Sequence, residues 1–306
     1  MAERRPAPRP STWDGADEPL IAVRDLHRVY LRPRTSLRQP PPRVEALRGV
    51  SFDISAGQRF GIVGESGSGK STLLRLLCAL DTPTSGSIRF AGREITGRPE
   101  RELRFLRREM QIVFQDPMGS LNPRMRVRDI ICEPLVVQGH RHRSGRLREL
   151  LAAVGLQPDA GDRFPHQFSG GQRQRISIAR ALATSPSVLV ADEPVSSLDV
   201  SVRAQILNLL ADLVAEYSLT LVFVSHDLSV VQRVCDTVAV LHDGELVELG
   251  PTSQVYDAPR HPYTRRLVAS IPTIRRALTG VDAATLAREA AAAGGDQTDS
   301  EEERAG

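Results

Sequence analysis

A glycine-rich segment, GESGSGKST at residues 64–72, constrains the fold of this chain more than any other feature. The run RFGIVG before it is typical of a short buried strand, and KSTLLRLLCAL after it has the apolar spacing of an amphipathic helix. Glycine lets the backbone approach a ligand closely, so the N–H groups of such a turn converge on phosphate oxygens at the positive end of the helix. The segment therefore predicts a phosphate-binding loop inside an α/β fold.

Lysine occurs at a single position of the sequence, residue 70, although Lys and Arg together number 40. Its ammonium group is a compact charge that reaches between the β- and γ-phosphates inside a tight loop, where the planar fork of arginine fits less well. The hydroxyl of Ser71 follows as a ligand for Mg²⁺. The residues that we expect to bind the nucleotide here are Gly64, Glu65, Ser66, Gly67, Ser68, Gly69, Lys70, Ser71 and Thr72.

Composition and patterning indicate a globular α/β protein. The sequence has 306 residues, of which 41% are hydrophobic and 25% charged, enough for one sizeable core. Strand-like runs alternate with helical patterns between about residues 20 and 271, which predicts a largely parallel sheet, and a helix-rich stretch interrupts them at about 117–183. No apolar run approaches the roughly 20 residues that span a bilayer, so this chain alone is not expected to form a channel.

The two ends of the chain differ from this middle region. Residues 1–19 are rich in Pro and Arg, and residues 276–306 become polar and acidic, so we expect both to be largely disordered. The N-terminus lacks the apolar segment of a signal peptide, and Cys78, Cys132 and Cys235 are too scattered for a disulfide framework or metal cluster, which favours the cytosol. A net charge of +3 with dispersed arginines gives little support to a nucleic-acid partner.

A second candidate site lies where an apolar run ends in two acidic residues. The segment SVLVADEP places Asp192 and Glu193 at the end of a buried strand, the edge at which open α/β sheets bind ligands. Asp192 suits a Mg²⁺ ligand, and Glu193 suits a general base that orients an attacking water. The alternative is an acidic strand end that only leads into a loop.

The segment FSGGQRQRISIARALA offers another anion-binding surface. Ser169, Gly170 and Gly171 precede a long helix, whose free N–H groups and dipole favour a phosphate group. The alternative is a plain helix cap made by the same serine. The chain therefore carries two surfaces that suit phosphate.

Taken together, these segments resemble the ATPase subunit of an ATP-binding cassette (ABC) transporter over about residues 20–271. In that family GESGSGKS is the Walker A loop, VFQDP supplies the Q-loop residue Gln115, and FSGGQ is the signature. LVADEP is Walker B, SSLD is the D-loop, and SHD contains the switch histidine, His226. All six motifs occur here in order. The resemblance implies a P-loop NTPase cassette over 20–250, with a RecA-like core, an antiparallel β subdomain and a helical subdomain.

The resemblance also implies a head-to-tail dimer with ATP at its interface. Each nucleotide would lie between the Walker A loop of one subunit and the signature of the other. The signature residues that would contact the partner's ATP are Ser169, Gly170, Gly171 and Gln172. Asp199 would organise the contact between the two subunits.

Within one subunit, the resemblance implies catalytic roles for Lys70, Glu193 and His226, which bind phosphate, position water and sense the γ-phosphate. The residues that would surround Mg²⁺ are Ser71, Gln115 and Asp192, and Gln115 also belongs to the ATP site. Tyr30 ends the first strand, where the family places an aromatic that stacks on adenine, although an insertion, LRPRTSLRQPPPRVEALRGV, follows here. The alternative for Tyr30 is packing alone.

Finer features are similar to the oligopeptide and dipeptide importer branch. They are the segment DPMGSLNPRMRVRDII, Phe168 in the signature, and the tail VYDAPRHPYTRRLVASIP, which indicates a C-terminal extension over 251–275. The branch implies two membrane permeases as partners, an extracytoplasmic solute-binding protein acting indirectly, and a place on the cytoplasmic face of the membrane. The helix-rich stretch after Gln115 would form the groove for a permease helix. No cysteine follows Cys235, so we predict no iron–sulfur cluster, although many relatives carry one.

Two other functions share this cassette. Soluble ATPases of DNA repair, chromosome organisation and translation add zinc modules, long coiled coils or a second cassette, and the sequence shows none of these. A regulatory cassette without hydrolysis is also possible, but Glu193, His226 and Ser169 are all present. We therefore predict an ATP-hydrolysing importer subunit for peptides or related small solutes, paired with itself or with a sister subunit.

Overall fold

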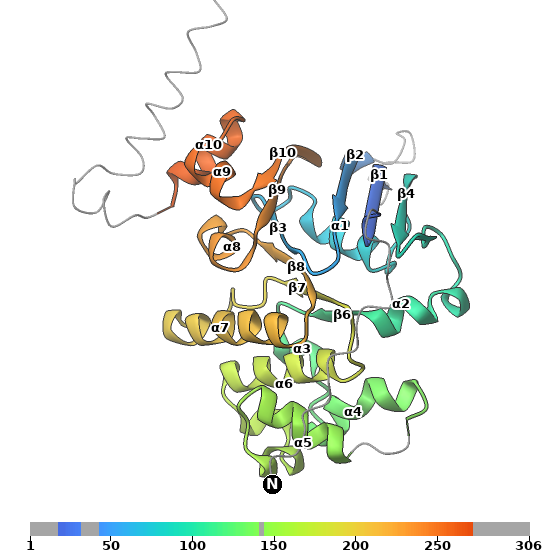
Figure 1. Cartoon of the computed structure of the whole chain (residues 1–306), viewed down its shortest axis with the longest axis vertical. Helices are drawn as coiled ribbons and strands as arrows, with labels where there is room; N and C mark the ends of the chain where they lie inside the picture. The colour runs from blue at the N-terminus through green and yellow to red at the C-terminus, as the bar shows by residue number, and fades with distance from the viewer. Residues whose placement is uncertain (1–17, 32–42, 141–143, 272–306) are drawn as a thin grey trace, which may run out of the picture.

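The computed structural model describes residues 18–31, 43–140 and 144–271 of the chain (Figure 1). The ends that we predicted to be disordered, residues 1–19 and 276–306, lie outside these ranges except for residues 18 and 19. Residues 32–42 of the predicted insertion also lie outside them. Within the described residues, two sheets and a group of helices form one α/β structure, which confirms the predicted fold class.

The larger sheet has a parallel core, as the sequence predicts. Its strands lie in the order β10 (Glu245–Pro251), β9 (Thr237–His242), β3 (Arg59–Val63), β8 (Thr220–Ser225), β7 (Val188–Asp192) and β6 (Met110–Val113). All neighbouring pairs run parallel except β10 with β9. Because helices or the second sheet cover both faces, the central strands are near-continuous apolar runs rather than alternating ones.

This sheet separates two hydrophobic cores, since successive side chains of a strand point to opposite faces. In β7, Val188 and Val190 join the core shared with the smaller sheet, whereas Leu189 and Ala191 join the core shared with the helices. All four side chains are fully buried. Apolar packing on both faces therefore fixes the register at which the loops after the strands emerge.

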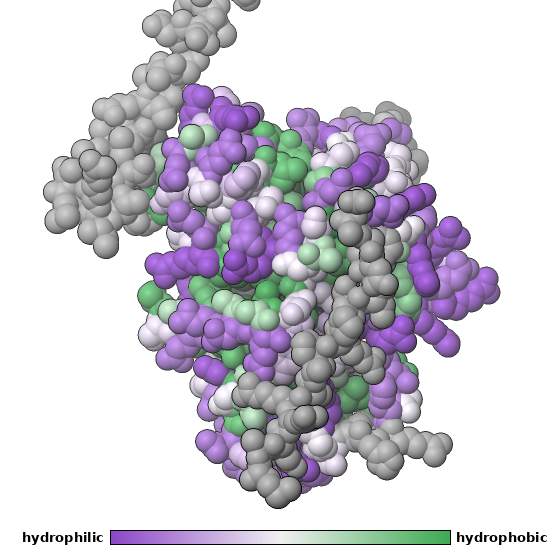
Figure 2. All heavy atoms as spheres, viewed as in Figure 1, coloured by the Kyte–Doolittle hydropathy of each residue, from purple (hydrophilic) through white to green (hydrophobic). Residues whose placement is uncertain are grey.

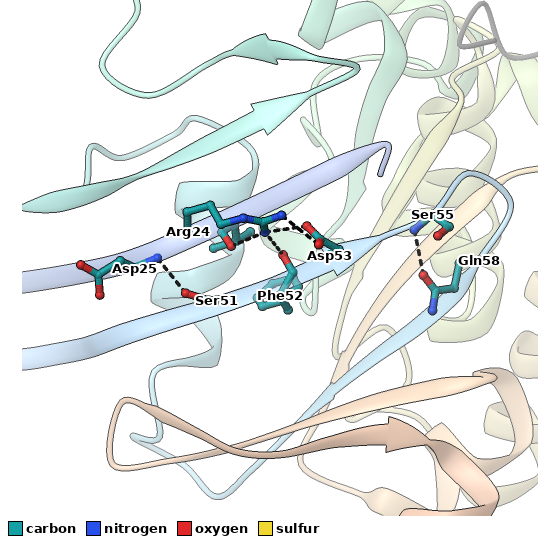
Figure 3. A network of polar contacts seen from close by, with 8 residues as sticks. Arg24, Asp25, Ser51, Phe52, Asp53, Ser55 and Gln58 are labelled. Carbon is teal, nitrogen blue, oxygen red and sulfur yellow. Dashed lines mark hydrogen bonds and ion pairs between the residues drawn. The ribbon is translucent and has the colours of Figure 1, made fainter. Parts of the chain in front are cut away.

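The smaller sheet is antiparallel, with the order β2 (Arg43–Ile54), β1 (Ile21–Leu31), β4 (Ser85–Phe90) and β5 (Arg93–Glu94). Figure 3 shows polar contacts that tie β1 to β2: the Arg24 guanidinium donates to the Asp53 carboxylate, and the Asp25 N–H donates to the Ser51 hydroxyl. Part of the predicted insertion is not a loop. Its last segment, RVEALRGV, forms the first part of β2 and pairs with β1.

Figure 1 draws α3, α4, α5, α6 and α7 below the large sheet, and α8, α9 and α10 on its left. The helix α1 instead packs between the sheets, where its leucines join the core of the smaller one. The bounds are α1 (Lys70–Leu77), α2 (Arg104–Glu109), α3 (Pro117–Ser120), α4 (Val127–Val137), α5 (Ser144–Ala153), α6 (Gly170–Leu182), α7 (Val200–Glu216), α8 (Leu228–Val234), α9 (Thr252–Asp257) and α10 (Pro262–Ala269). Short 3₁₀ turns are η1 (Glu100–Glu102), η2 (Pro158–Asp162) and η3 (Pro165–Gln167).

The surface is largely polar around this framework. Figure 2 shows hydrophilic side chains along the edge at which Figure 1 draws α2. None of the helices described has both the length and the apolar character of a membrane span. Cys78, Cys132 and Cys235 are buried, and none of them forms a disulfide bond within the described residues.

The packing of β3 against α8 generates a stability prediction. A methyl group on Gly61 would lie 2.3 Å from Val231 Cγ1 and 3.4 Å from the Sγ of Cys235. We expect Gly61→Ala to lower the free energy of unfolding by about 1–3 kcal/mol, because overpacking displaces α8. Urea unfolding measures this. Gly145→Ala is the matched control, since nothing lies within 4 Å of that position, and it should be neutral or slightly stabilising. Equal stabilities for the two variants would contradict the prediction.

Candidate functional site

The glycine-rich loop (residues 64–69) connects β3 to α1, as predicted. Gly69 ends it with φ 103°, and a Cβ at that position would lie 2.5 Å from the carbonyl oxygen of Ala46. Gly67 has φ 86° and open space where a side chain would be. Residues with a side chain rarely adopt either backbone conformation, so the fold needs glycine at both positions. No side chain of the described residues caps the start of α1, which leaves its first N–H groups for a ligand.

Lys70 is the first residue of α1, and its side chain is buried against this loop. Its ammonium group donates to the carbonyl oxygens of Gly64 at 2.7 Å and Glu65 at 2.8 Å. Burial lowers the pKa of Lys70, while the negative charges of Glu193 and Asp192 oppose that change. The loop thus concentrates a desolvated cation at the carboxyl edge of the large sheet.

The other predicted loop residues divide into two groups. Glu65, Ser66 and Ser71 are exposed, so their side chains face solvent. Ser68 is buried and Thr72 is partly buried, and the Ser68 carbonyl accepts from the N–H of Gly244, in the turn between β9 and β10. The loop is therefore hydrogen-bonded to the β9–β10 turn of the large sheet on one side and exposed to solvent on the other.

Of the three residues predicted to surround Mg²⁺, the structure places Asp192 and Gln115 after adjacent strands, and their role stays a prediction. Asp192 ends β7, and Gln115 lies two residues beyond β6, which pairs with β7. Both line a cavity of ≈ 650 Å³. Burial raises the pKa of Asp192 and the charge of Glu193 raises it further, against the lowering effect of Lys70 and Arg75. Ser71 is exposed on α1 and is not among the residues that line this cavity.

Glu193 and His226 are in direct contact, which sequence patterns did not predict. Glu193 follows β7 and His226 follows β8, and the Glu193 Oε2 lies 3.0 Å from the His226 Nδ1. The Glu193 backbone has φ 43°, an unfavourable value for a residue with a side chain. Its N–H donates to the Val224 carbonyl at 2.9 Å, which holds this conformation in place. The carboxylate is mostly buried, whereas the imidazole is 57% exposed.

The FSGGQ segment begins α6, as predicted, and also forms its cap. The Gln172 N–H donates to the Ser169 hydroxyl at 3.3 Å, and the Ser169 N–H donates to the Gln172 side chain at 3.0 Å. Gly171 packs against α7, because a Cβ there would lie 2.5 Å from Val202 Cγ1, and Gly170 is exposed. Figure 1 draws α6 in the lower, helical part and α1 beside the small sheet, so the two anion surfaces belong to different parts of the chain.

Asp199 lies at the start of α7 and is exposed. Its side chain makes no cap hydrogen bond to that helix, although its carbonyl accepts from the Arg203 N–H at 2.8 Å. The carboxylate is thus presented to solvent beside Val200, which is 81% exposed.

Tyr30 is the second-last residue of β1, and it has partners that the sequence did not indicate. Its hydroxyl donates to the Asp81 carboxylate at 2.7 Å, and the Arg28 guanidinium lies 4.4 Å from the ring centroid. These contacts are those expected if Tyr30 serves in packing, and stacking of Tyr30 on adenine stays a prediction.

The glycine-rich loop also has a contact that the sequence did not indicate. The Tyr263 hydroxyl accepts a hydrogen bond from the Glu65 N–H at 2.9 Å. In the sequence, the segment that contains Tyr263 indicated only a similarity to the peptide importer branch, and it gave no sign of a contact with this loop.

Two families match the sequence. Residues 47–196 match the family described as ABC transporter, and residues 247–295 match the family described as oligopeptide/dipeptide transporter, C-terminal region. The chain is 46% identical over 260 residues to the di/tripeptide transport ATP-binding protein DppF of Pseudomonas aeruginosa, covering 84% of this chain and 80% of that protein. It is also 46% identical over 263 residues to the oligopeptide transport ATP-binding protein AppF of Bacillus subtilis, covering 85% and 80% respectively.

Solved structures agree in fold. A dimeric structure of the ATP-binding cassette MJ0796, in a post-hydrolysis state bound to ADP and Pi, is similar with a TM-score of 0.67 and 30% identity. That likeness covers 76% of this chain and 98% of the other. The structure of cbiO1 from Clostridium perfringens, part of the ABC transporter complex cbiONQ, gives a TM-score of 0.69 and 27% identity over 86% of this chain and 100% of the other.

The environment of Asp192 generates a prediction about stability and pH. Because the pKa of Asp192 is raised in the folded state, its charged carboxylate destabilises the fold at neutral pH. This penalty declines as the pH falls below the folded-state pKa, and it is gone below the lower pKa of the unfolded chain. We expect Asp192→Asn to raise the melting temperature at neutral pH, with a smaller gain at acidic pH. The exposed Asp199→Asn is the control and should change little. A lower melting temperature for Asp192→Asn at neutral pH would contradict this account.

Proposed function

This chain belongs to the ABC transporter family, as an ATP-binding subunit of the oligopeptide/dipeptide import branch, and we propose that the residues described above bind and hydrolyse ATP at the carboxyl edge of its large sheet. It is an ATPase whose hydrolysis drives transport. The observation that carries the proposal is the convergence of three chemically different groups. Lys70, His226 and Glu193 follow the adjacent strands β3, β8 and β7.

The glycine-rich loop and the start of α1 fit the phosphates of ATP. The uncapped N–H groups and the helix dipole favour an anion, and Lys70 adds a positive charge beside them. The exposed Ser66 and Ser71 hydroxyls are available on the open side of the loop. The first turn of α1 carries no acidic side chain that would repel the phosphates.

The donor set beside this loop fits Mg²⁺. We propose Ser71, Gln115 and Asp192 as its protein ligands, because Mg²⁺ prefers oxygen donors and is commonly held by one or two carboxylates together with substrate phosphates. Consistent with that mode, the described ranges hold no cluster of three His, Cys, Asp or Glu side chains suited to a metal. When bound, Mg²⁺ neutralises charge on the β- and γ-phosphate oxygens.

The Glu193–His226 pair supplies groups for hydrolysis. The Glu193 carboxylate is positioned to orient a water molecule and to accept its proton, work that general bases perform. Contact with the His226 Nδ1 fixes the direction of that carboxylate, and the second ring nitrogen is left for the γ-phosphate. The positive φ of Glu193 indicates that its placement is retained at a cost in backbone strain.

The exposed residues Ser169, Gly170 and Gln172 of the FSGGQ segment, together with exposed Asp199, support a dimer in which ATP lies between two cassettes. Ser169, Gly170, Gly171 and Gln172 form the N-terminus of α6, in a different part of the chain from its own glycine-rich loop, so we propose that they contact the partner's ATP. Asp199 would organise the same interface. The partner is a second copy or a sister subunit, and loss of the γ-phosphate contacts on hydrolysis would release it.

We propose that the ≈ 650 Å³ cavity is the groove for a cytoplasmic helix of a membrane permease. Its mouth carries exposed apolar side chains, Leu80 at 52% and Phe114 at 40%, which suit an apolar partner surface. Gln115 lines the same cavity, so it would link nucleotide occupancy to the permease.

The proposed assembly sits at the cytoplasmic face of the membrane with two permeases, and a solute-binding protein acts from the other side. The proposed chain layout is a cassette over 20–250, with a helical subdomain at about 117–183, and an extension over 251–275.

The assignment of the general base generates a kinetic prediction. We expect Glu193→Gln to bind ATP normally but to lower kcat by about 10²- to 10⁴-fold, because the amide cannot accept the proton of the attacking water. Size-exclusion chromatography with MgATP should then retain a dimer. Glu245→Gln removes an exposed carboxylate on β10 and should hydrolyse ATP normally. Near-normal turnover by Glu193→Gln would remove Glu193 from this role.

A further inference from the structure

We infer that Tyr263, in the C-terminal segment, is a positioning residue for the glycine-rich loop. Its hydroxyl fixes the orientation of the Gly64–Glu65 peptide, which in turn holds the Lys70 ammonium group. The inference rests on the proposed function of this loop in binding ATP, and it deepens that proposal by giving the C-terminal segment a part in the nucleotide site.

One peptide group is held at both of its polar ends. The N–H of Glu65 donates to the Tyr263 hydroxyl at 2.9 Å, and the carbonyl of Gly64, in the same peptide unit, accepts from the Lys70 Nζ at 2.7 Å. Because a peptide unit is planar, fixing the direction of its N–H also fixes the direction of its C=O. Tyr263 therefore controls the carbonyl that positions Lys70, without touching Lys70 itself.

Burial makes this hydrogen bond effective. Tyr263 is 2% exposed, and its ring stacks on His242 with the centroids 3.9 Å apart and an angle of 16° between the planes. Burial also raises the pKa of the Tyr263 hydroxyl, so the group stays neutral at physiological pH. A hydrogen bond shielded from water restrains its partners more strongly than an exposed one.

The segment that carries Tyr263 is itself fastened to the large sheet. The Glu248 carboxylate, on β10, accepts from the N–H groups of Arg260 at 2.9 Å and His261 at 3.1 Å. The His261 Nδ1 then accepts from the Tyr263 N–H at 3.2 Å and caps α10. His242, the stacking partner of Tyr263, ends β9, the strand that pairs with β10. These contacts place the hydroxyl at a fixed position relative to the loop.

The consequence concerns two parts of the chain that are 198 residues apart. The C-terminal segment is hydrogen-bonded to the glycine-rich loop, so the backbone conformation of the loop is fixed before nucleotide binds. Without the Tyr263 hydroxyl, the Gly64–Glu65 peptide would have to be ordered during binding, and part of the binding free energy would be lost to that step.

The test is Tyr263→Phe in the full chain, because it removes only the hydroxyl and keeps the ring on His242. We expect MgATP and MgADP to bind about three- to tenfold more weakly, the range that one hydrogen bond contributes. The KM for ATP should rise in step, while kcat at saturating ATP changes by less than about twofold. The melting temperature should fall by no more than a few degrees, because a single hydrogen bond is lost and the ring packing is kept. Tyr256→Phe is the matched control, as its hydroxyl has no hydrogen bond within the described residues.

A second measurement does not depend on nucleotide binding. In the wild-type chain without nucleotide, the Glu65 amide should exchange slowly with deuterium, and Tyr263→Phe should accelerate that exchange while other loop amides change less. Fast exchange in the wild type, or unchanged nucleotide affinity in Tyr263→Phe, would overturn the inference and leave the proposed function intact. Failure of the wild type to bind nucleotide would instead overturn the proposed function, and the exchange result would still decide the hydrogen bond.

Discussion

Burial of the Lys70 ammonium group at the carboxyl edge of the large sheet is the constraint on which the rest of the structure depends. A buried cation is costly unless polar groups surround it. Here the carbonyls of Gly64 and Glu65 accept its protons, and the charges of Glu193 and Asp192 oppose the fall in its pKa. The carbonyls require a tightly turned loop, and the acidic residues require β7, which runs parallel to β8, the neighbour of β3.

The same constraint explains why the groups that we propose as catalytic meet. Parallel strands end at one edge, so the loops after β3, β8 and β7 emerge side by side, and the Glu193–His226 contact follows from that order. The positive φ of Glu193 and the raised pKa of Asp192 are both unfavourable for the isolated fold. Such features are common where a site is shaped for a ligand rather than for stability.

Local patterns in the sequence predicted much of the fold and of the candidate site. The apolar runs identified β3, β7 and β8, because a strand buried on both faces has little choice of residue type. The two-residue β5 and the half-exposed β10 lacked such a signal, and RVEALRGV was assigned to an insertion although it pairs with β1. Ser169 proved to form a helix cap, as one of its two interpretations predicted, while its role towards a partner's ATP stays a proposal.

Contacts between distant segments were beyond the reach of those patterns. Nothing in the spacing of the tail indicated that Tyr263 would meet Glu65, because that contact depends on how β9, β10 and α10 fold together. The central claim, that this subunit drives import through membrane partners, is tested most directly by purifying the protein from its native membranes in mild detergent and identifying co-purifying proteins by mass spectrometry. The account predicts two multi-span permeases, with a second ATPase subunit or a second copy of this chain. Ribosomal or DNA-repair partners without any membrane protein would contradict it.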